Sequence, residues 1–194
     1  MGSITSSAPV EIRKPGRRLT MLLGVPWLVI ETSLGSLIVE LNACRAPNTC
    51  ANFLRYVDGE CYDGGQFHRT VRLGNQPDSS VLIEVIQASK REDLAEDMFP
   101  PIELERTSET GLRHRSGAIS MARSGPDSAT SDFFICVGDQ PELDFGGARN
   151  PDGQGFAVFG EVLWGMDVVL EIQKSPAEGQ TLSPPIKILR VSRL

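Results

Sequence analysis

The sequence has few of the residues on which metal centres and covalent catalysis usually depend. Among 194 residues there are only two histidines and four cysteines. The cysteines form no Cys-x-x-Cys pair and have no histidine pair nearby, which argues against a zinc site. A Ser–His–Asp or Cys–His hydrolase would have to use His68 or His114, and the chain contains no Gly-x-Ser-x-Gly motif. We therefore expect free thiols on all four cysteines, which are Cys44, Cys50, Cys61 and Cys136. Free thiols are typical of a reducing compartment, so we expect a cytoplasmic protein.

The sequence also lacks an excess of positive charge and any long hydrophobic run. Its 19 Lys and Arg against 25 Asp and Glu give a net charge of −6, whereas nucleic-acid binders normally carry a basic face. The longest uncharged apolar stretch, from Met21 to Ile30, contains Gly24 and Pro26 and is much shorter than the roughly 20 residues of a membrane span. These absences leave one globular domain that contacts neither nucleic acid nor membrane.

The first residues differ in charge from the rest of the chain. Arg13, Lys14, Arg17 and Arg18 against Glu11 give residues 1–20 a local charge of +3, which leaves −9 for the remainder. The segment is rich in Ser, Gly and Pro and has no periodicity, so we expect a flexible basic tail over residues 1–25 and a folded domain over 26–194. A secretory signal or an N-terminal lipid anchor stays open as an alternative for this tail.

Two glycine-rich patterns resemble ligand loops without meeting their requirements. The glycines between Gly146 and Gly155 are followed by a strand pattern and no Gly-Lys-Ser/Thr, so they do not form a phosphate loop. The spacing from Asn150 to Glu161 copies a calcium loop, but it has only two carboxylates and no flanking helices. We interpret this region as a turn.

The pattern of apolar residues predicts a mainly β protein. A helix is expected from Pro47, where Cys50, Phe53, Leu54 and Val57 recur at helical spacing, and another near 165–173, where Met166, Val169 and Leu170 should be buried. Closing eight antiparallel strands into a barrel would remove their exposed edges. The eight predicted strands cover 27–32, 36–41, 66–71, 81–88, 117–122, 132–137, 157–163 and 186–193.

Five motifs in a fixed order resemble one family. They are Tyr62 to Arg69 (YDGGQFHR), Ser120 to Pro126 (SMARSGP), Ser131 to Cys136 (SDFFIC), Phe159 to Val162 (FGEV) and Gly165 to Val169 (GMDVV). Together with the opening hairpin they resemble the cyclophilins, peptidyl-prolyl cis–trans isomerases, in a divergent and bacterial-like form. The likeness extends from about Leu28 to Val191 and implies a closed eight-stranded antiparallel β-barrel capped by two α-helices.

The resemblance also implies roles for individual residues. Arg69 matches the catalytic arginine of the family, Phe134 the floor of its proline pocket, and Gln87 the glutamine that holds the arginine and binds the substrate backbone. Rotation about a peptide bond makes and breaks no covalent bond, so no nucleophile, metal or cofactor is needed. The expected substrate-binding residues are Val85, Ala122, Arg123, Leu143 and Phe156, with Glu84 and Glu142 at positions where the family is usually aromatic.

The chain departs from the family pattern around this groove. Seventeen residues separate Arg69 from Gln87, more than the family usually has, so Gln76 stays an alternative to Gln87. Glu142 stands where many members carry the tryptophan that binds cyclosporin, which predicts weak cyclosporin binding. Glu84, Asp132 and Glu142 predict an acidic rim that favours peptides with Lys or Arg near the proline.

We expect a monomeric isomerase that acts on proline-containing peptides and unfolded proteins. The alternative is a weakly active or inactive relative that binds proline-containing peptides as an interaction module.

Overall fold

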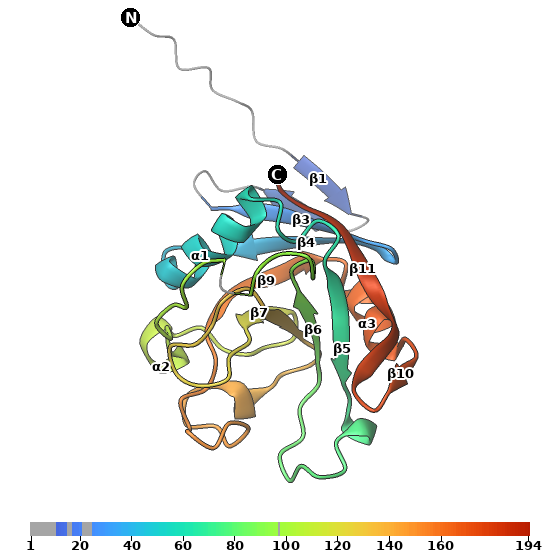
Figure 1. The fold of residues 1–194 in the computed structure, drawn as a ribbon. Helices are drawn as coiled ribbons and strands as arrows, with labels where there is room; N and C mark the ends of the chain where they lie inside the picture. Colours follow the sequence, from blue (N-terminus) through green and yellow to red (C-terminus); the bar gives the residue numbers. More distant parts are fainter. Residues whose placement is uncertain (1–10, 15–16, 21–24, 97) are drawn as a thin grey trace, which may run out of the picture.

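The computed structural model describes residues 11–14, 17–20, 25–96 and 98–194. Eight antiparallel strands form a closed barrel in the order β11-β3-β4-β9-β7-β8-β6-β5, and β11 pairs again with β5 to complete the ring (Figure 1). The predicted barrel is therefore correct. Its strands are β3 (Trp27–Thr32), β4 (Gly35–Leu41), β5 (Gln66–Val71), β6 (Val85–Ser89), β7 (Ala118–Met121), β8 (Phe133–Cys136), β9 (Val158–Trp164) and β11 (Thr181–Arg193).

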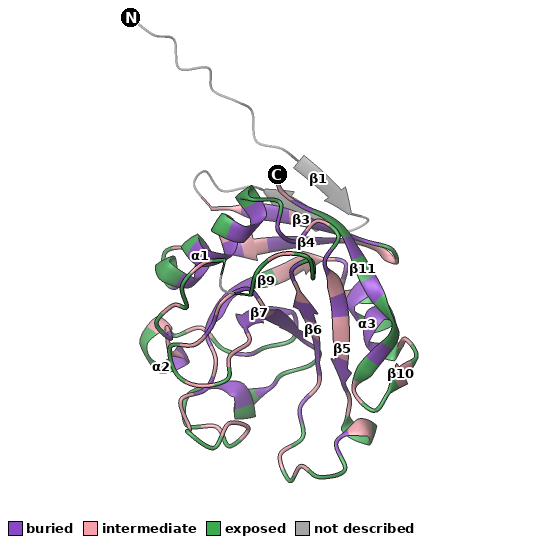
Figure 2. Ribbon diagram, in the orientation of Figure 1, coloured by how far each residue is buried: buried purple, intermediate pink, exposed green. Residues whose placement is uncertain are grey.

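Alternation of side chains along the strands fills the barrel. In the β3–β4 hairpin Leu28 lies opposite Val39 and Ile30 opposite Leu37, and all four are fully buried. Every second residue therefore points inward, as a half-buried strand requires. Figure 2 shows this pattern as buried positions along the barrel strands and on the inner side of the helices.

Two helices cover the barrel on opposite sides (Figure 1). The first, α1 (Pro47–Asp58), begins at the expected proline and buries Cys50, Phe53, Tyr56 and Val57. The second, α3 (Met166–Lys174), packs on β4, β5 and β6. It buries Val168, Val169 and Ile172, whereas Leu170, which was expected inside, is 37% exposed. A third helix, α2 (Thr107–Thr110), is a single turn that periodicity did not predict.

Aromatic rings form the centre of the main core. Phe53 of α1 lies 5.0 Å from Tyr62, 5.3 Å from Phe133 and 5.0 Å from Phe159, measured between ring centroids. Such tilted and edge-on contacts add to the free energy gained by burying the rings. A second, smaller apolar cluster surrounds Phe134 on the other side of β8, where alternation directs it away from Phe133.

Several elements differ from the sequence-based expectation. The strand predicted from residue 81 begins only at Val85, because the side chain of Gln76 bonds the backbone N–H and C=O of Ile83 in place of a neighbouring strand. Two 3-10 turns, η1 (Leu73–Asn75) and η2 (Pro141–Leu143), and the two-residue strand β10 (Ala177–Glu178) were not predicted.

The expected tail contains a small element of secondary structure. In the described part of residues 1–25, β1 (Glu11–Lys14) and β2 (Arg17–Thr20) pair as an antiparallel hairpin that the sequence did not indicate. The backbone of the barrel domain begins to be described at Val25, and the first barrel strand at Trp27. The predicted boundary at residue 26 stays a prediction.

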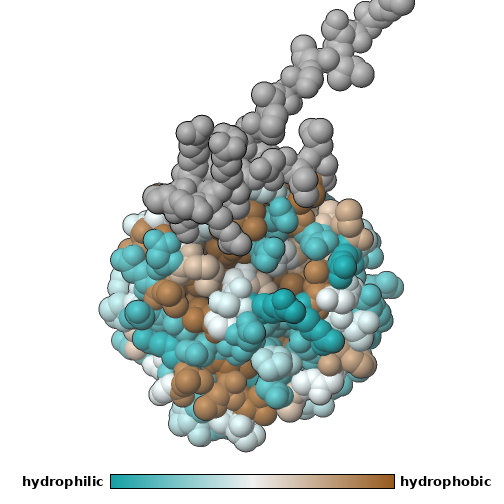
Figure 3. Space-filling model, turned by 180° about the vertical axis from the view of Figure 1, so that it is seen from behind, coloured by the Kyte–Doolittle hydropathy of each residue, from teal (hydrophilic) through white to brown (hydrophobic). Residues whose placement is uncertain are grey.

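The outer surface carries both hydrophobic and hydrophilic side chains. Seen from behind, hydrophobic residues occur among hydrophilic ones across the barrel domain (Figure 3). Among the described residues, none of the helices has the length and apolar character that crossing a bilayer would require.

Candidate functional site

One pocket is lined by most of the site residues that the sequence predicts. It has a volume of about 170 Å³ and opens beside β5, β6 and β8. Eight of the ten predicted site residues line it, and Ile83 and Arg149 complete the wall. The eight are Arg69, Val85, Gln87, Ala122, Arg123, Phe134, Leu143 and Phe156.

Arg69 is held at the edge of this pocket by two neutral amides. Its Nη1 donates to Oε1 of Gln87 at 2.9 Å, while its Nε and Nη2 donate to Oε1 of Gln180 at 2.9 and 2.6 Å. Arg69 and Gln87 are also register partners on β5 and β6, so the strand pairing itself places them side by side. Within the described part of the chain three of the five guanidinium donors are thus engaged, which leaves one N–H on each terminal nitrogen.

Gln87, and not Gln76, is therefore the glutamine that contacts the arginine. Gln76 is buried and its amide bonds Arg72 and Ile83, so it shapes the loop between β5 and β6. Gln180 is a second hydrogen-bond partner of Arg69, which the sequence did not reveal. It lies in the turn between β10 and β11, and its own Nε2 donates to the carbonyl of Asn75 at 3.1 Å.

The floor of the pocket is apolar. Phe134 meets Phe156 edge-on with 5.5 Å between ring centroids, and Ile83, Val85 and Leu143 belong to the same buried cluster. Phe134 and Phe156 therefore offer the large rigid surface that an apolar ring would need.

Behind Phe134 a buried histidine supports the floor. The His114 ring stacks on Phe134 at 5.9 Å, its Nδ1 lies 2.8 Å from Oδ1 of Asp144 and its Nε2 lies 3.0 Å from Oγ of Ser120. Burial lowers the pKa of His114, although the hydrogen bond and charge of Asp144 counteract this in part. The imidazole is fully enclosed and structural, because it does not line the pocket.

A second arginine of the pocket is already neutralised. Arg123 forms two hydrogen bonds with the Asp152 carboxylate at 2.7 and 2.9 Å, and its Nε donates to the carbonyl of Gly155 at 2.8 Å. The guanidinium also lies 5.0 Å from the centroid of Phe156. Hydrogen bonding to Arg123 lowers the pKa of Asp152 to about 2. This ion pair fixes the loop before β9 against the pocket wall.

Neither of the two predicted glutamates lies in the pocket, which corrects the sequence analysis. The Glu84 carboxylate faces away from it and accepts a hydrogen bond from Nε2 of Gln173 on α3 at 3.2 Å. The reason is the two-residue period of extended chain, because Ile83, Val85 and Gln87 occupy the pocket side. Glu142 is exposed and accepts from the backbone N–H of Ala148 at 2.9 Å.

Asp132 lies behind Gln87 and does not line the pocket. One of its carboxylate oxygens is 3.4 Å from Nε2 of Gln87, and burial raises its pKa. His68 is its electrostatic partner, and burial lowers the pKa of this histidine. The acidic rim expected from Glu84, Asp132 and Glu142 is therefore absent from the pocket lining.

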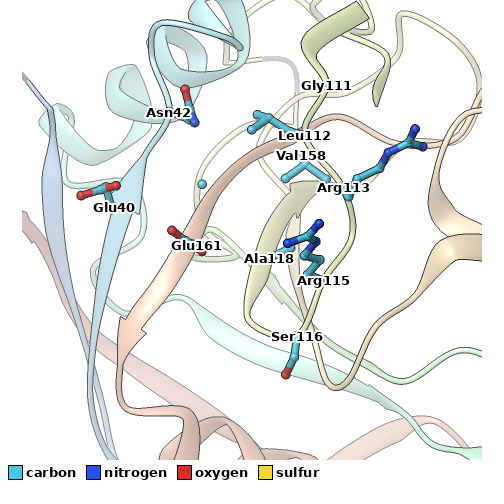
Figure 4. Close-up of a pocket in the computed structure, with 11 residues that line it drawn as sticks. Glu40, Asn42, Gly111, Leu112, Arg113, Arg115, Ser116, Ala118, Val158 and Glu161 are labelled. Carbon is cyan, nitrogen blue, oxygen red and sulfur yellow. The ribbon is translucent and has the colours of Figure 1, made fainter. Parts of the chain in front are cut away.

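A second cavity has a different character. It measures about 270 Å³ and is lined by Glu40 of β4, by Glu161 of β9 and by a loop that carries Arg113 and Arg115 (Figure 4). None of the predicted site residues lines it. Among the described residues, no group of three or more His, Cys, Asp or Glu side chains is placed to hold a metal ion.

Comparison with known proteins agrees with the fold. Residues 27–193 match the family model described as cyclophilin type peptidyl-prolyl cis-trans isomerase/CLD. A peptidyl-prolyl cis-trans isomerase of Acinetobacter baylyi is 34% identical over 168 residues, 84% of this chain and 82% of that protein. The isomerase cyp18 of Streptomyces antibioticus is 38% identical over 141 residues, 72% of this chain and 78% of that protein.

A solved structure shares the fold. The crystal structure of a cyclophilin type peptidyl-prolyl cis-trans isomerase from Cryptosporidium parvum superimposes with a TM-score of 0.71 at 21% identity, covering 88% of this chain and 98% of that one. The family model spans nearly the whole barrel domain, and the fold agrees with it. The chain belongs to the cyclophilin-type peptidyl-prolyl cis–trans isomerases.

Proposed function

We propose that Arg69, held above the apolar floor around Phe134, carries out the peptidyl-prolyl isomerisation of this family. The observation that carries the proposal is a fixed cation beside an apolar pocket, with two N–H donors that no other described residue engages. A proline ring fits such a pocket because it is apolar and compact. The peptide bond before it then lies beside the guanidinium.

The chemical task is to favour the twisted peptide bond over both planar forms. The barrier to rotation is about 18–20 kcal/mol, because twisting removes the amide resonance. In the twisted state the prolyl nitrogen regains a lone pair, which can accept a hydrogen bond from a cation. Arg69 is suited to this role, since an arginine stays protonated at neutral pH and its position is fixed before substrate arrives. A donor that binds the twisted form better than the planar ones lowers the barrier.

The expected partners are proline-containing peptides and unfolded proteins. The likeness to a Cryptosporidium parvum cyclophilin whose structure was determined in the presence of the dipeptide Ala-Pro supports this proposal. The monomeric state and the cytoplasmic location stay predictions.

An isomerisation assay tests the assignment. We expect a short X–Pro peptide to interconvert faster with the wild-type protein, and Arg69→Ala to lower kcat/KM on the order of 10²-fold, as for loss of one preorganised donor to a transition state. Arg69→Lys should restore only part of the activity, because an ammonium cannot use both glutamines as a guanidinium does. Equal activity of wild type and Arg69→Ala would overturn the role of Arg69. Binding of the peptide without any acceleration would favour the alternative of a non-catalytic module.

Weak cyclosporin binding is a separate prediction. Glu142 is exposed and does not line the pocket, so the indole contact that the family offers at this position is missing. Isothermal titration calorimetry should give a dissociation constant well above the nanomolar range, and a nanomolar value would contradict the prediction.

A further inference from the structure

The feature that the isomerase assignment leaves unexplained is a third arginine in the same pocket. Arg149 lies in the long loop between η2 and β9 and lines the pocket together with Arg69. Its backbone N–H donates to the carbonyl of Glu142 at 3.2 Å, which holds this part of the loop against η2. Position 149 lies outside the five motifs by which the sequence resembles the family, so those motifs suggest no role for it.

The side chain of Arg149 is held in place by neutral oxygens. Its Nη1 lies 3.1 Å from Oε1 of Gln76, 2.8 Å from Oγ of Ser79 and 2.7 Å from the carbonyl oxygen of Val81. All three belong to the loop between β5 and β6, so the two long loops meet at this guanidinium. The arrangement orients the cation before a ligand arrives.

The charge of Arg149 is not compensated within the described part of the chain. No carboxylate there lies within 4.0 Å of its nitrogens, and its Nε and Nη2 donate no hydrogen bond. Among the described residues, the side chain of Arg69 likewise donates hydrogen bonds only to glutamine amides. Arg123 differs, because Asp152 neutralises it.

The charges of the two arginines also favour an anionic ligand in the pocket. Burial lowers the pKa of Arg149, and burial together with the charge of Arg149 lowers the pKa of Arg69. Two protonated guanidinium groups therefore lie close enough to repel each other. An anionic group that enters the pocket would relieve this repulsion and find unused N–H donors on Arg149.

We infer that this pocket selects X–Pro segments that carry an acidic side chain next to the proline, and that Arg149 is the residue that determines this specificity. The inference rests on the proposed function and adds its substrate preference. It reverses the preference for Lys or Arg expected from the sequence, because Glu84 and Glu142 lie outside the pocket while Arg149 lies inside it. A lysine next to the proline is disfavoured by the same two cations.

The test compares matched peptides on matched variants. The peptides have blocked ends and differ only at one position next to the proline, which is Glu, Gln or Lys. Blocking the ends separates an acidic side chain from a terminal carboxylate. The ratio of kcat/KM for the Glu peptide to that for the Gln peptide is measured at low salt for wild type, Arg149→Gln, Arg149→Glu and Arg115→Gln. Arg115 is the matched control, since it is an arginine that lines the second cavity.

We expect a Glu to Gln ratio of about 10 for wild type, as for one charge-assisted contact. The ratio should fall to about 1 in Arg149→Gln, remain unchanged in Arg115→Gln and decline with added salt. In Arg149→Glu the Lys peptide should become the best of the three, which a general loosening of the loop would not produce.

Other outcomes separate this inference from the isomerase assignment. A wild-type ratio near 1, or the same ratio in wild type and Arg149→Gln, would overturn the specificity role while leaving the activity intact. If no peptide is isomerised, the proposed function fails, and the affinities of the Glu and Gln peptides measured by calorimetry still decide the inference. Equal affinities for the Glu and Gln peptides would overturn the inference. Tighter binding of the Glu peptide than of the Gln peptide by the wild type, but not by Arg149→Gln, would support it.

Discussion

Arg69 shows how single side chains prepare this site. Its guanidinium is fixed by Gln87 from the neighbouring strand and by Gln180 from a turn more than one hundred residues away in sequence. Both partners are neutral, so they orient the cation without cancelling its charge. Preorganisation of this kind is the main way in which a fixed donor favours a transition state.

Gln180 should therefore act as a positioning residue. We expect Gln180→Ala to lower kcat by roughly 10-fold with a smaller change in KM, because the donor to the twisted bond becomes mobile while the apolar pocket remains. Steady-state kinetics of the isomerisation checks this split. Gln66→Ala is the matched control, since Gln66 lies on β5 like Arg69 but bonds Glu92 and not the arginine. A change confined to KM in Gln180→Ala would contradict the positioning role.

The four cysteines differ sharply in their expected reactivity. Cys44 is exposed, whereas the other three are buried. Burial raises the pKa of Cys50 to about 12 and also raises the pKa of Cys61 and Cys136, so these groups form little of the reactive thiolate at neutral pH. We expect the native protein to react rapidly with one equivalent of a thiol reagent, and Cys44→Ser to remove that reaction. Rapid labelling of a second thiol, read by mass spectrometry, would be inconsistent with this structure.

Among the elements, the loop between η2 and β9 decides the shape of the pocket. Gly155 lies in this loop with φ +67°, and its carbonyl accepts the hydrogen bond from Arg123. A Cβ at this position would lie 2.5 Å from the carbonyl carbon of Asp144 and 2.6 Å from the nitrogen of Phe145. Backbone atoms cannot move aside as a flexible side chain can, so glycine is required here.

Gly153 provides the matched comparison for this loop. It also has positive φ, at +64°, but a Cβ there would meet nothing within 4 Å. We expect Gly153→Ala to lower the free energy of unfolding by about 1 kcal/mol from the left-handed conformation alone. Gly155→Ala should lower it by roughly 2–4 kcal/mol, since overpacking adds to that strain. Urea denaturation measures both, and equal losses would show that the contact with Asp144 and Phe145 does not matter.

For the whole molecule, the buried His114 and the half-buried His68 connect stability to pH. Burial lowers the pKa of His114 from 6.5, and it also lowers the pKa of His68. As pH falls through about 6.5 the unfolded chain takes up protons that the folded protein does not, so acid favours unfolding. The stability that the two neutral histidines contribute is present above about pH 6.5 and is lost as the pH falls below that value.

We expect the free energy of unfolding to decrease from about pH 7.5 to about pH 5.5 in the wild type. His114→Gln should be less stable at pH 7.5, because it alters the contacts with Asp144 and Ser120, but its stability should depend less on pH. Urea denaturation at a series of pH values compares the two slopes. Parallel slopes would show that His114 takes up its proton equally in both states.

Most of the barrel could be predicted from the sequence, because alternation and helical spacing record which side chains are buried. Leu28, Ile30 and Phe53 all lie where these patterns place them. The strand β6 was predicted four residues too early, since the backbone of Ile83 bonds to the side chain of Gln76 and not to another strand. A pattern of apolar residues does not distinguish these two partners.

The site was predictable only where motifs or strands define it. Assigning both Glu84 and Val85 to the pocket conflicts with the alternation of side chains, and the pairing of Gln87 with Arg69 decides in favour of Val85. Arg149 and Gln180 could not be found, because they lie in loops whose positions depend on contacts across the whole fold. Periodicity carries no information about such contacts.

The closure of the barrel by β11 has a consequence for how the protein folds. The strand pairs Ile188 with Thr32 and Ile186 with Phe67, so the ring is complete only when residues very distant in sequence meet. Contacts between residues so far apart in sequence cost loop-closure entropy, which slows the folding of barrels relative to helical proteins. Until β11 joins, the edges of β3 and β5 remain open for pairing with other chains, so we expect the incomplete barrel to be more prone to aggregation than the closed one.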